Sequence, residues 1–187
     1  MSKFLLLLGV SGVGKSSIIQ ELLRLDARFT YISPFMTRAL RKDERDKLPI
    51  IDEEMNRRRD DGEFLAVNEL YGVRYATPWL PIVRALRNNR FPILDWPLSQ
   101  IGVMRRAFPG QLFIVYVLPP STESLGWRLA KDGRDPAGHR LQSAYQELKA
   151  YQSVRDVEPF NLEVVSEDNL IEETALFIYR RYIEYDQ

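Results

Sequence analysis

The sequence predicts an α/β fold built on a parallel sheet. Short apolar runs at Phe4–Val10, Phe91–Asp95 and Leu112–Leu118 suit strands that are buried on both faces. Segments in which apolar residues recur at helical spacing lie between these runs, and a glycine-rich loop directly follows the first one. Strands that alternate with helices in this way indicate parallel pairing, with helices as the crossovers.

The first third of the chain contains one clear helix and one charged segment. Apolar residues recur at helical spacing over Ser16–Leu25, and a short second strand is expected at Tyr31–Ile32, before Pro34. From residue 37 to residue 61, charged residues are dense and apolar residues are few. This composition favours a loop followed by a solvated helix at Asp52–Asp60.

The middle of the chain predicts a small hairpin and then a helix. Strands at Phe64–Val67 and Val73–Ala76 would flank a turn at Tyr71-Gly72. A helix follows at Pro78–Asn88. Its Pro81 lies near the first turn, where a missing N–H costs no helical hydrogen bond.

The second half of the chain continues the alternation of strands and helices. Ser121 is placed to cap a helix that contains Leu125 and Leu129, and Lys131–Gly138 is a polar loop with two glycines and a proline. The other predicted elements are a short helix at Met104–Phe108, a helix at Arg140–Tyr151, a strand at Leu162–Val165 and a helix at Leu170–Tyr185.

Composition excludes several classes of function. The 187 residues include 26 basic and 26 acidic side chains, no cysteine and one histidine, His139. Balanced charge argues against partners such as nucleic acid or an anionic membrane, and no apolar run approaches the ~20 residues of a membrane helix. Without cysteine, disulfides, iron–sulfur clusters and structural zinc are not expected. We expect one cytoplasmic domain, residues 1–187, whose oligomeric state the sequence does not indicate.

The loop after the first strand matches the phosphate-binding pattern GxxxxGK[ST] at Gly9, Gly14, Lys15 and Ser16. Glycines let backbone N–H groups curl around phosphate oxygens, and the start of the next helix adds partial positive charge. The lysine reaches the terminal phosphates, and the serine hydroxyl binds Mg²⁺. We therefore expect ATP to be bound by Gly9, Ser11, Gly12, Val13, Gly14, Lys15, Ser16 and Ser17.

Further polar groups fit a phosphoryl-transfer site. Asp95 ends a buried strand, where its carboxylate can orient either the water shell of a metal or a substrate. Arg38 and Arg41 lie three residues apart, and Glu44 follows at the same spacing. Arginine forks hold a phosphate dianion bidentately, and the glutamate can fix one arginine or contact the substrate. A solvated charged loop is the alternative interpretation of this segment.

Together these motifs resemble the guanylate kinase family over nearly the whole chain. The matching motifs are Gly9–Ser17, Thr37-Arg38-x-x-Arg41-x-x-Glu44, Phe64-Leu65, Tyr75-Ala76-Thr77, Ile93-Leu94-Asp95, Pro119-Pro120-Ser121, Leu125-x-x-Arg128-Leu129, Arg140-Leu141 and Glu147-Leu148. The resemblance implies a three-layer P-loop kinase fold with a parallel sheet. It also implies an acceptor-binding insert at 33–76, a short lid at 130–139, and a core of 1–32, 77–129 and 140–187.

The resemblance also implies roles for individual residues. The acceptor would be held by Arg38, Arg41 and Tyr75 at its phosphate, with Glu44, Thr77 and Asp95 beside them. Lys15 and Ser16 would hold the donor ATP and Mg²⁺. The catalytic set would be Lys15 with Arg128, Arg134 and Arg140, three arginines around the lid that neutralise charge on the transferred group. The implied reaction is transfer of the γ-phosphoryl group of ATP to a phosphorylated acceptor, by default GMP or dGMP.

Three departures from the family pattern concern the acceptor. Pro34 replaces a serine, Ala66 replaces the base-reading glutamate, and Pro97 replaces a second acid. Proline and alanine side chains accept no hydrogen bond from a guanine edge, although Asn68 or Glu69 could compensate. The sequence therefore retains a phosphorylated acceptor and loses the family's way of reading guanine.

Two alternatives to a GMP or dGMP kinase stay open. The replacements favour another nucleotide, or a phosphorylated sugar such as a ribose bisphosphate precursor. A second class is a non-catalytic, guanylate-kinase-like binding module. Such scaffolds typically have a degraded phosphate loop, whereas Lys15, Ser16 and the glycines are intact here.

Overall fold

A parallel five-stranded sheet forms the main body of the molecule. The computed structural model describes residues 3–40, 44, 46–131, 133, 135, 138–157 and 159–186. The strand order is β2-β7-β1-β8-β9, and every neighbouring pair is parallel. The strands are β1 (Phe4–Leu8), β2 (Phe29–Tyr31), β7 (Phe91–Asp95), β8 (Leu112–Leu118) and β9 (Leu162–Val165). The predicted α/β fold with a parallel sheet is confirmed.

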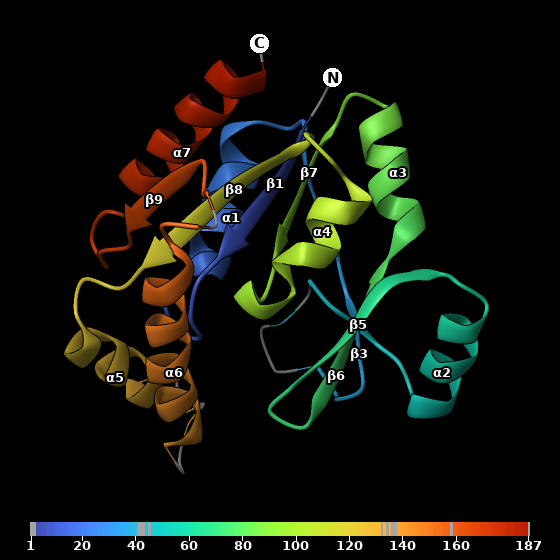
Figure 1. Ribbon diagram of the computed structural model, residues 1–187, viewed down its shortest axis with the longest axis horizontal. Helices are drawn as coiled ribbons and strands as arrows, with labels where there is room; N and C mark the ends of the chain where they lie inside the picture. Colours follow the sequence, from blue (N-terminus) through green and yellow to red (C-terminus); the bar gives the residue numbers. More distant parts are fainter. Residues whose placement is uncertain are drawn as a thin grey trace.

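Helices cover both faces of this sheet and make three layers (Figure 1). Leu5 and Leu7 of β1 pack in one core cluster with apolar residues of α1 and α7. Phe4 and Leu6 point to the other face and pack with residues of α3 and α4. The whole of β1 is buried, as expected for a strand covered on both sides. These helices are α1 (Lys15–Leu25), α3 (Trp79–Arg87), α4 (Ile101–Ala107) and α7 (Ile171–Asp186).

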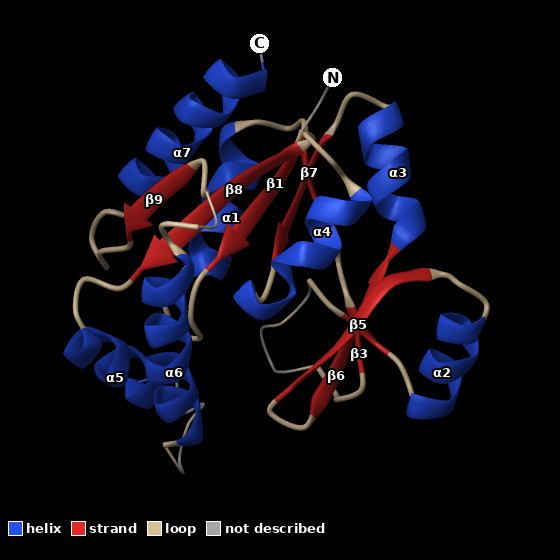
Figure 2. Ribbon diagram, viewed as in Figure 1, coloured by secondary structure: helices blue, strands red, loops and turns tan. Residues whose placement is uncertain are grey.

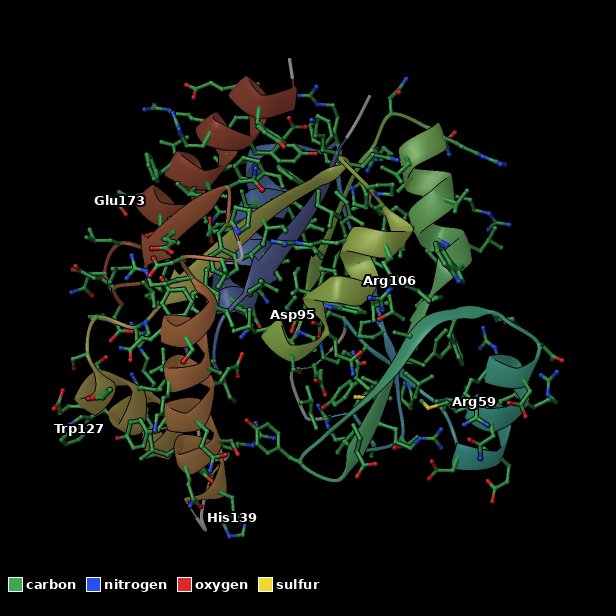
Figure 3. All side chains as sticks on the ribbon, in the orientation of Figure 1. Arg59, Asp95, Arg106, Trp127, His139 and Glu173 are labelled. Carbon is green, nitrogen blue, oxygen red and sulfur yellow. The ribbon has the colours of Figure 1, made fainter. Side chains whose placement is uncertain are left out.

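Two helices, α5 (Thr122–Lys131) and α6 (His139–Val154), lie beyond the carboxyl end of β8 (Figure 1). Ser121 caps α5 as predicted, because its Oγ accepts a hydrogen bond of 3.1 Å from the Ser124 N–H. His139 is exposed at the start of α6, at the edge of the molecule (Figure 3). None of the helices in the described part of the chain combines the length and apolar content needed to cross a membrane.

A second sheet with the order β4-β3-β6-β5 lies apart from the main one (Figure 2). Helix α2 packs on one of its faces, where Met55, Phe64 and Ala76 form a small separate core. The elements of this part are β3 (Phe35–Met36), β4 (Leu48–Pro49), α2 (Asp52–Asp60), β5 (Phe64–Leu70) and β6 (Val73–Pro78).

Several boundaries differ from the sequence prediction. The hairpin strands β5 and β6 run longer than predicted, although the turn at Tyr71-Gly72 is where it was expected. Strands β3 and β4 are not predicted, because two-residue strands in a charged segment carry no readable periodicity. A 3₁₀ turn at Leu98–Gln100 leads into α4, which begins three residues earlier than predicted.

Candidate active site

The glycine-rich loop connects β1 to α1 and has the backbone that phosphate binding requires. Gly9 and Gly14 have φ values of 132° and 102°, a region that L side chains rarely adopt. A Cβ at Gly9 would collide with the Val117 carbonyl oxygen, and one at Gly14 would lie 2.7 Å from the Ser166 Oγ. Helix α1 has no side-chain N-cap. Its first N–H groups are therefore available to an anion.

Lys15 is the first residue of α1, and its side chain folds back over the loop. Its Nζ donates hydrogen bonds to the carbonyl oxygens of Gly9 and Val10, the second at 2.9 Å. Burial lowers the pKa of Lys15 from its usual value, while the carboxylates of Asp95 and Glu147 act in the opposite direction. The ammonium group is thus hydrogen-bonded to the loop and interacts electrostatically with two acidic side chains.

Arg128 of α5 is hydrogen-bonded to the glycine-rich loop. Its guanidinium donates to the carbonyl oxygens of Val13, at 3.2 Å, and Ser166, at 2.6 Å, and its Nε lies 2.9 Å from a carboxylate oxygen of Asp168. These bonds join the loop to α5 and to the segment after β9. A role for Arg128 on the transferred phosphoryl group stays a prediction.

Asp95, at the end of β7, is the centre of a charged network near the middle of the molecule (Figure 3). The Tyr31 hydroxyl donates to Asp95 Oδ1 at 2.9 Å, and the Lys47 Nζ donates to that hydroxyl at 3.1 Å. Burial opposes ionisation of Asp95, but Lys47, Lys15 and the Tyr31 hydroxyl outweigh it and hold the pKa of Asp95 below its usual value. Sequence reasoning missed Tyr31 and Lys47, which no motif marks.

Arg38 is held by Glu44 in a two-pronged ion pair, with N–O distances of 2.6 and 2.7 Å. Hydrogen bonding to Glu44 raises the pKa of Arg38. Burial acts in the opposite direction, and the Tyr75 side chain raises the pKa further. Within the described part of the chain, the buried Arg38 Nε has no hydrogen-bond partner. Arg41, the second predicted arginine, lies outside the described residues.

The second sheet has two distinct faces. Met36, Tyr75 and Asn68 are directly opposite one another across β3, β6 and β5, so their side chains share one face. Ala66 and Thr77 form the next pair on this face of the hairpin, and Ala66 packs on the core of the main sheet. This face therefore points toward the main sheet, whereas the other face packs on α2.

The hairpin tip touches α6. The Arg140 guanidinium lies 4.7 Å from the centre of the Tyr71 ring, a cation–π contact. Tyr71 adopts a φ of 54°, which is unusual for a residue other than glycine. The Asp135 carboxylate accepts 2.9 Å hydrogen bonds from the N–H groups of Arg140 and Leu141 and so caps the start of α6. The predicted lid residue Arg134 lies outside the described residues.

Glu147 of α6 should make the folded protein less stable as pH rises. Burial raises the pKa of Glu147 above its usual 4.5, although Lys15 opposes the shift. Between the two values the folded state binds more protons than the unfolded chain, so the free energy of unfolding falls with increasing pH. We expect Glu147→Gln to be more stable than the wild type at pH 7, with a difference that shrinks toward pH 4.5.

Urea unfolding at a series of pH values measures this difference, with Glu173→Gln, an exposed site on α7, as the matched control (Figure 3). A difference that does not change with pH would show that the carboxyl charge of Glu147 is not the cause.

No group of three or more His, Asp or Glu side chains suited to a metal occurs among the described residues. The metal ligand that the loop offers instead is the hydroxyl of Ser16, beside the uncapped start of α1. This fits a magnesium ion that is held mainly by nucleotide phosphates and water, since Mg²⁺ seldom uses an all-protein cage.

Comparisons with known proteins agree with this architecture. The family model "Guanylate kinase" matches residues 1–183. A guanylate kinase of Carboxydothermus hydrogenoformans is 32% identical over 146 residues, 75% of this chain and 71% of that relative. One of Trichormus variabilis is 29% identical over 172 residues, 89% of this chain and 83% of that relative. The crystal structure of guanylate kinase from Anaplasma phagocytophilum covers 100% of this chain and 87% of that one, with a TM-score of 0.77 at 22% identity.

Proposed function

Because this chain belongs to the guanylate kinase family, we propose that it transfers the γ-phosphoryl group of ATP to the phosphate of GMP or dGMP. It is an enzyme of the guanylate kinase type, a phosphotransferase. The observation that carries the proposal is the pairing of an intact phosphate loop around Lys15 with the Arg38–Tyr75 pair. The first suits a nucleoside triphosphate, and the second suits a phosphate monoester.

The donor is assigned to the loop. Its backbone N–H groups and Lys15 hold the β- and γ-phosphates, and the Ser16 hydroxyl is a ligand for Mg²⁺. Bound Mg²⁺ neutralises charge on the phosphate oxygens. Lys15 is held at the loop by the Gly9 and Val10 carbonyl oxygens, and its Nζ would exchange these partners for triphosphate oxygens.

The acceptor is assigned to the face of the second sheet that points toward the main sheet. Arg38 and Tyr75 hold its phosphate together with Arg41, and Glu44 fixes the Arg38 fork. Thr77 and Asp95 are assigned to the same acceptor. Phosphoryl transfer depends on positioning and charge neutralisation, so no general-base histidine is required.

Closure is assigned to two parts, the insert at 33–76 and the lid at 130–139. The Tyr71–Arg140 contact supports this assignment, because it already joins the hairpin tip to the helix that follows the lid. Closing over both substrates would exclude water and limit wasteful hydrolysis of ATP. Arg140, Arg128 and Arg134 would then add positive charge around the transferred group.

Release of ADP from ATP·Mg²⁺ in the presence of single acceptors tests the proposal. The acceptors are GMP, dGMP, AMP, CMP, UMP, dTMP and ribose phosphates. We expect turnover with GMP or dGMP in the range of kinases, about 1–100 s⁻¹. ATP binding without turnover of any acceptor would overturn the kinase assignment.

A phosphorylated sugar is the second candidate acceptor. It is favoured by Pro34, Ala66 and Pro97, which offer no polar side-chain atom to a guanine edge. Turnover with a ribose phosphate and none with nucleotides would establish it in place of GMP.

A further inference from the structure

Asn68 is a buried polar side chain that the folded protein does not satisfy. It lies on β5 with 7% of its surface exposed. Its Oδ1 is fully buried and has no hydrogen-bond partner among the described residues. Burying an unpaired amide oxygen costs free energy, and an apolar side chain of similar size would avoid that cost. The position is therefore unfavourable for stability alone.

The sheet register places Asn68 on the acceptor side. Asn68 is directly opposite Tyr75, which interacts with the Arg38 guanidinium. The Asn68 side chain thus lies beside the groups assigned to the acceptor phosphate. The next residue, Glu69, pairs with Arg74, points to the opposite face and is exposed. Of the two residues that could compensate for Ala66, the structure favours Asn68.

The unpaired atom restricts what Asn68 can bind. An amide oxygen accepts hydrogen bonds and repels phosphate oxygens, so its partner is a neutral donor of the acceptor and not its phosphate. Among the neutral donors of GMP, the exocyclic amine of the base and the 2′-hydroxyl of the sugar can each be removed singly by using an analogue.

We propose that Asn68 is a specificity-determining residue that accepts a hydrogen bond from the acceptor, either from the exocyclic amine of its base or from its 2′-hydroxyl. The inference rests on the proposed function, because it assumes a nucleotide acceptor held at Arg38 and Tyr75. It differs from the family pattern in moving the reading group from position 66 to position 68 of the same strand.

Steady-state kinetics of the full chain with and without Asn68→Leu test this assignment. The leucine side chain has a similar size and removes the unpaired oxygen, so we expect the variant to be at least as stable to heat as the wild type. We expect its KM for GMP to rise about tenfold, the effect of losing one neutral hydrogen bond, and its KM for ATP to stay the same. Glu69→Gln, one residue away on the opposite face, is the matched control.

Two analogues identify the donor. IMP lacks the exocyclic amine of GMP, and dGMP lacks the 2′-hydroxyl. If the amine is the donor, the substitution should leave the KM for IMP unchanged; if the hydroxyl is the donor, it should leave the KM for dGMP unchanged. An equal rise in the KM for GMP, IMP and dGMP would overturn the assignment. So would a rise in the KM for ATP as large as that for GMP.

The result also separates this inference from the proposed function. Wild-type enzyme that turns over GMP and a variant that does so equally well would refute the role of Asn68 alone. Wild-type enzyme that turns over no nucleotide would refute the proposed acceptor, and the role of Asn68 with it.

Discussion

Replacing Lys15 with alanine should abolish phosphoryl transfer and leave the fold intact. The lysine is the only side chain assigned to contact the terminal phosphates within the loop. Removing one preorganised charged donor from such a site lowers kcat on the order of 10²–10³-fold. Its hydrogen bonds go to backbone carbonyl oxygens of Gly9 and Val10 within the same loop, so their loss is local. The measurement is ADP release with saturating acceptor, with circular dichroism as the test of folding.

Lys149→Ala is the matched control, because Lys149 is an exposed lysine of α6 with no assigned role. We expect it to retain wild-type turnover. Near-normal turnover by Lys15→Ala would remove the donor assignment, whatever the acceptor is.

The candidate donor site could be predicted from the sequence because its residues are close together in the chain. Gly9, Gly14, Lys15 and Ser16 lie within eight consecutive residues, and the strand before them and the helix after them have strong periodicity. The same holds for Asp95, which ends an apolar run that the structure forms as β7 without change of boundary. Where a site consists of one loop and its flanking elements, the spacing of residues in the sequence is sufficient to predict it.

The candidate acceptor site could be predicted only in part, because distant segments build it. Tyr31 meets Asp95 across 64 positions of the chain, and Lys47 meets Tyr31 across 16. No spacing encodes such contacts. The choice between Asn68 and Glu69 depends on strand register and on a bulge between Phe64 and Ala66, and neither can be read from composition.

The Tyr31–Asp95–Lys47 network also links the second sheet to the main one. Lys47 directly precedes β4 of the second sheet, whereas Tyr31 and Asp95 end strands β2 and β7 of the main sheet. Asp95 also interacts electrostatically with Lys15, so one carboxylate links the glycine-rich loop with this network. Sequence patterns place these residues in separate elements, and only packing brings them together.

Arg38→Ala should weaken use of the acceptor far more than binding of ATP. Because Arg38 is fixed by Glu44, its guanidinium is oriented before any ligand binds. Its buried Nε has no hydrogen-bond partner within the described residues. Loss of a charge-assisted hydrogen bond costs about 1.5–3 kcal/mol, which predicts a rise in the acceptor KM of roughly 10- to 100-fold. The KM for ATP should change less than about twofold, because the donor loop lies on another element.

Arg74→Ala is the matched control for Arg38→Ala. Arg74 lies on β6, beside β3, the strand that Arg38 follows. It also makes side-chain hydrogen bonds, of 2.8 Å to Asp52 and Asn56, but these partners lie on the α2 face. We expect Arg74→Ala to lower thermal stability and leave the acceptor KM unchanged. If both variants raised the two KM values equally, Arg38 would be a structural residue of the sheet. A selective rise for Arg38→Ala alone would favour an acceptor phosphate on the face that Tyr75 and Asn68 share, because Arg38 interacts with Tyr75 of that face whereas Arg74 contacts α2 on the other.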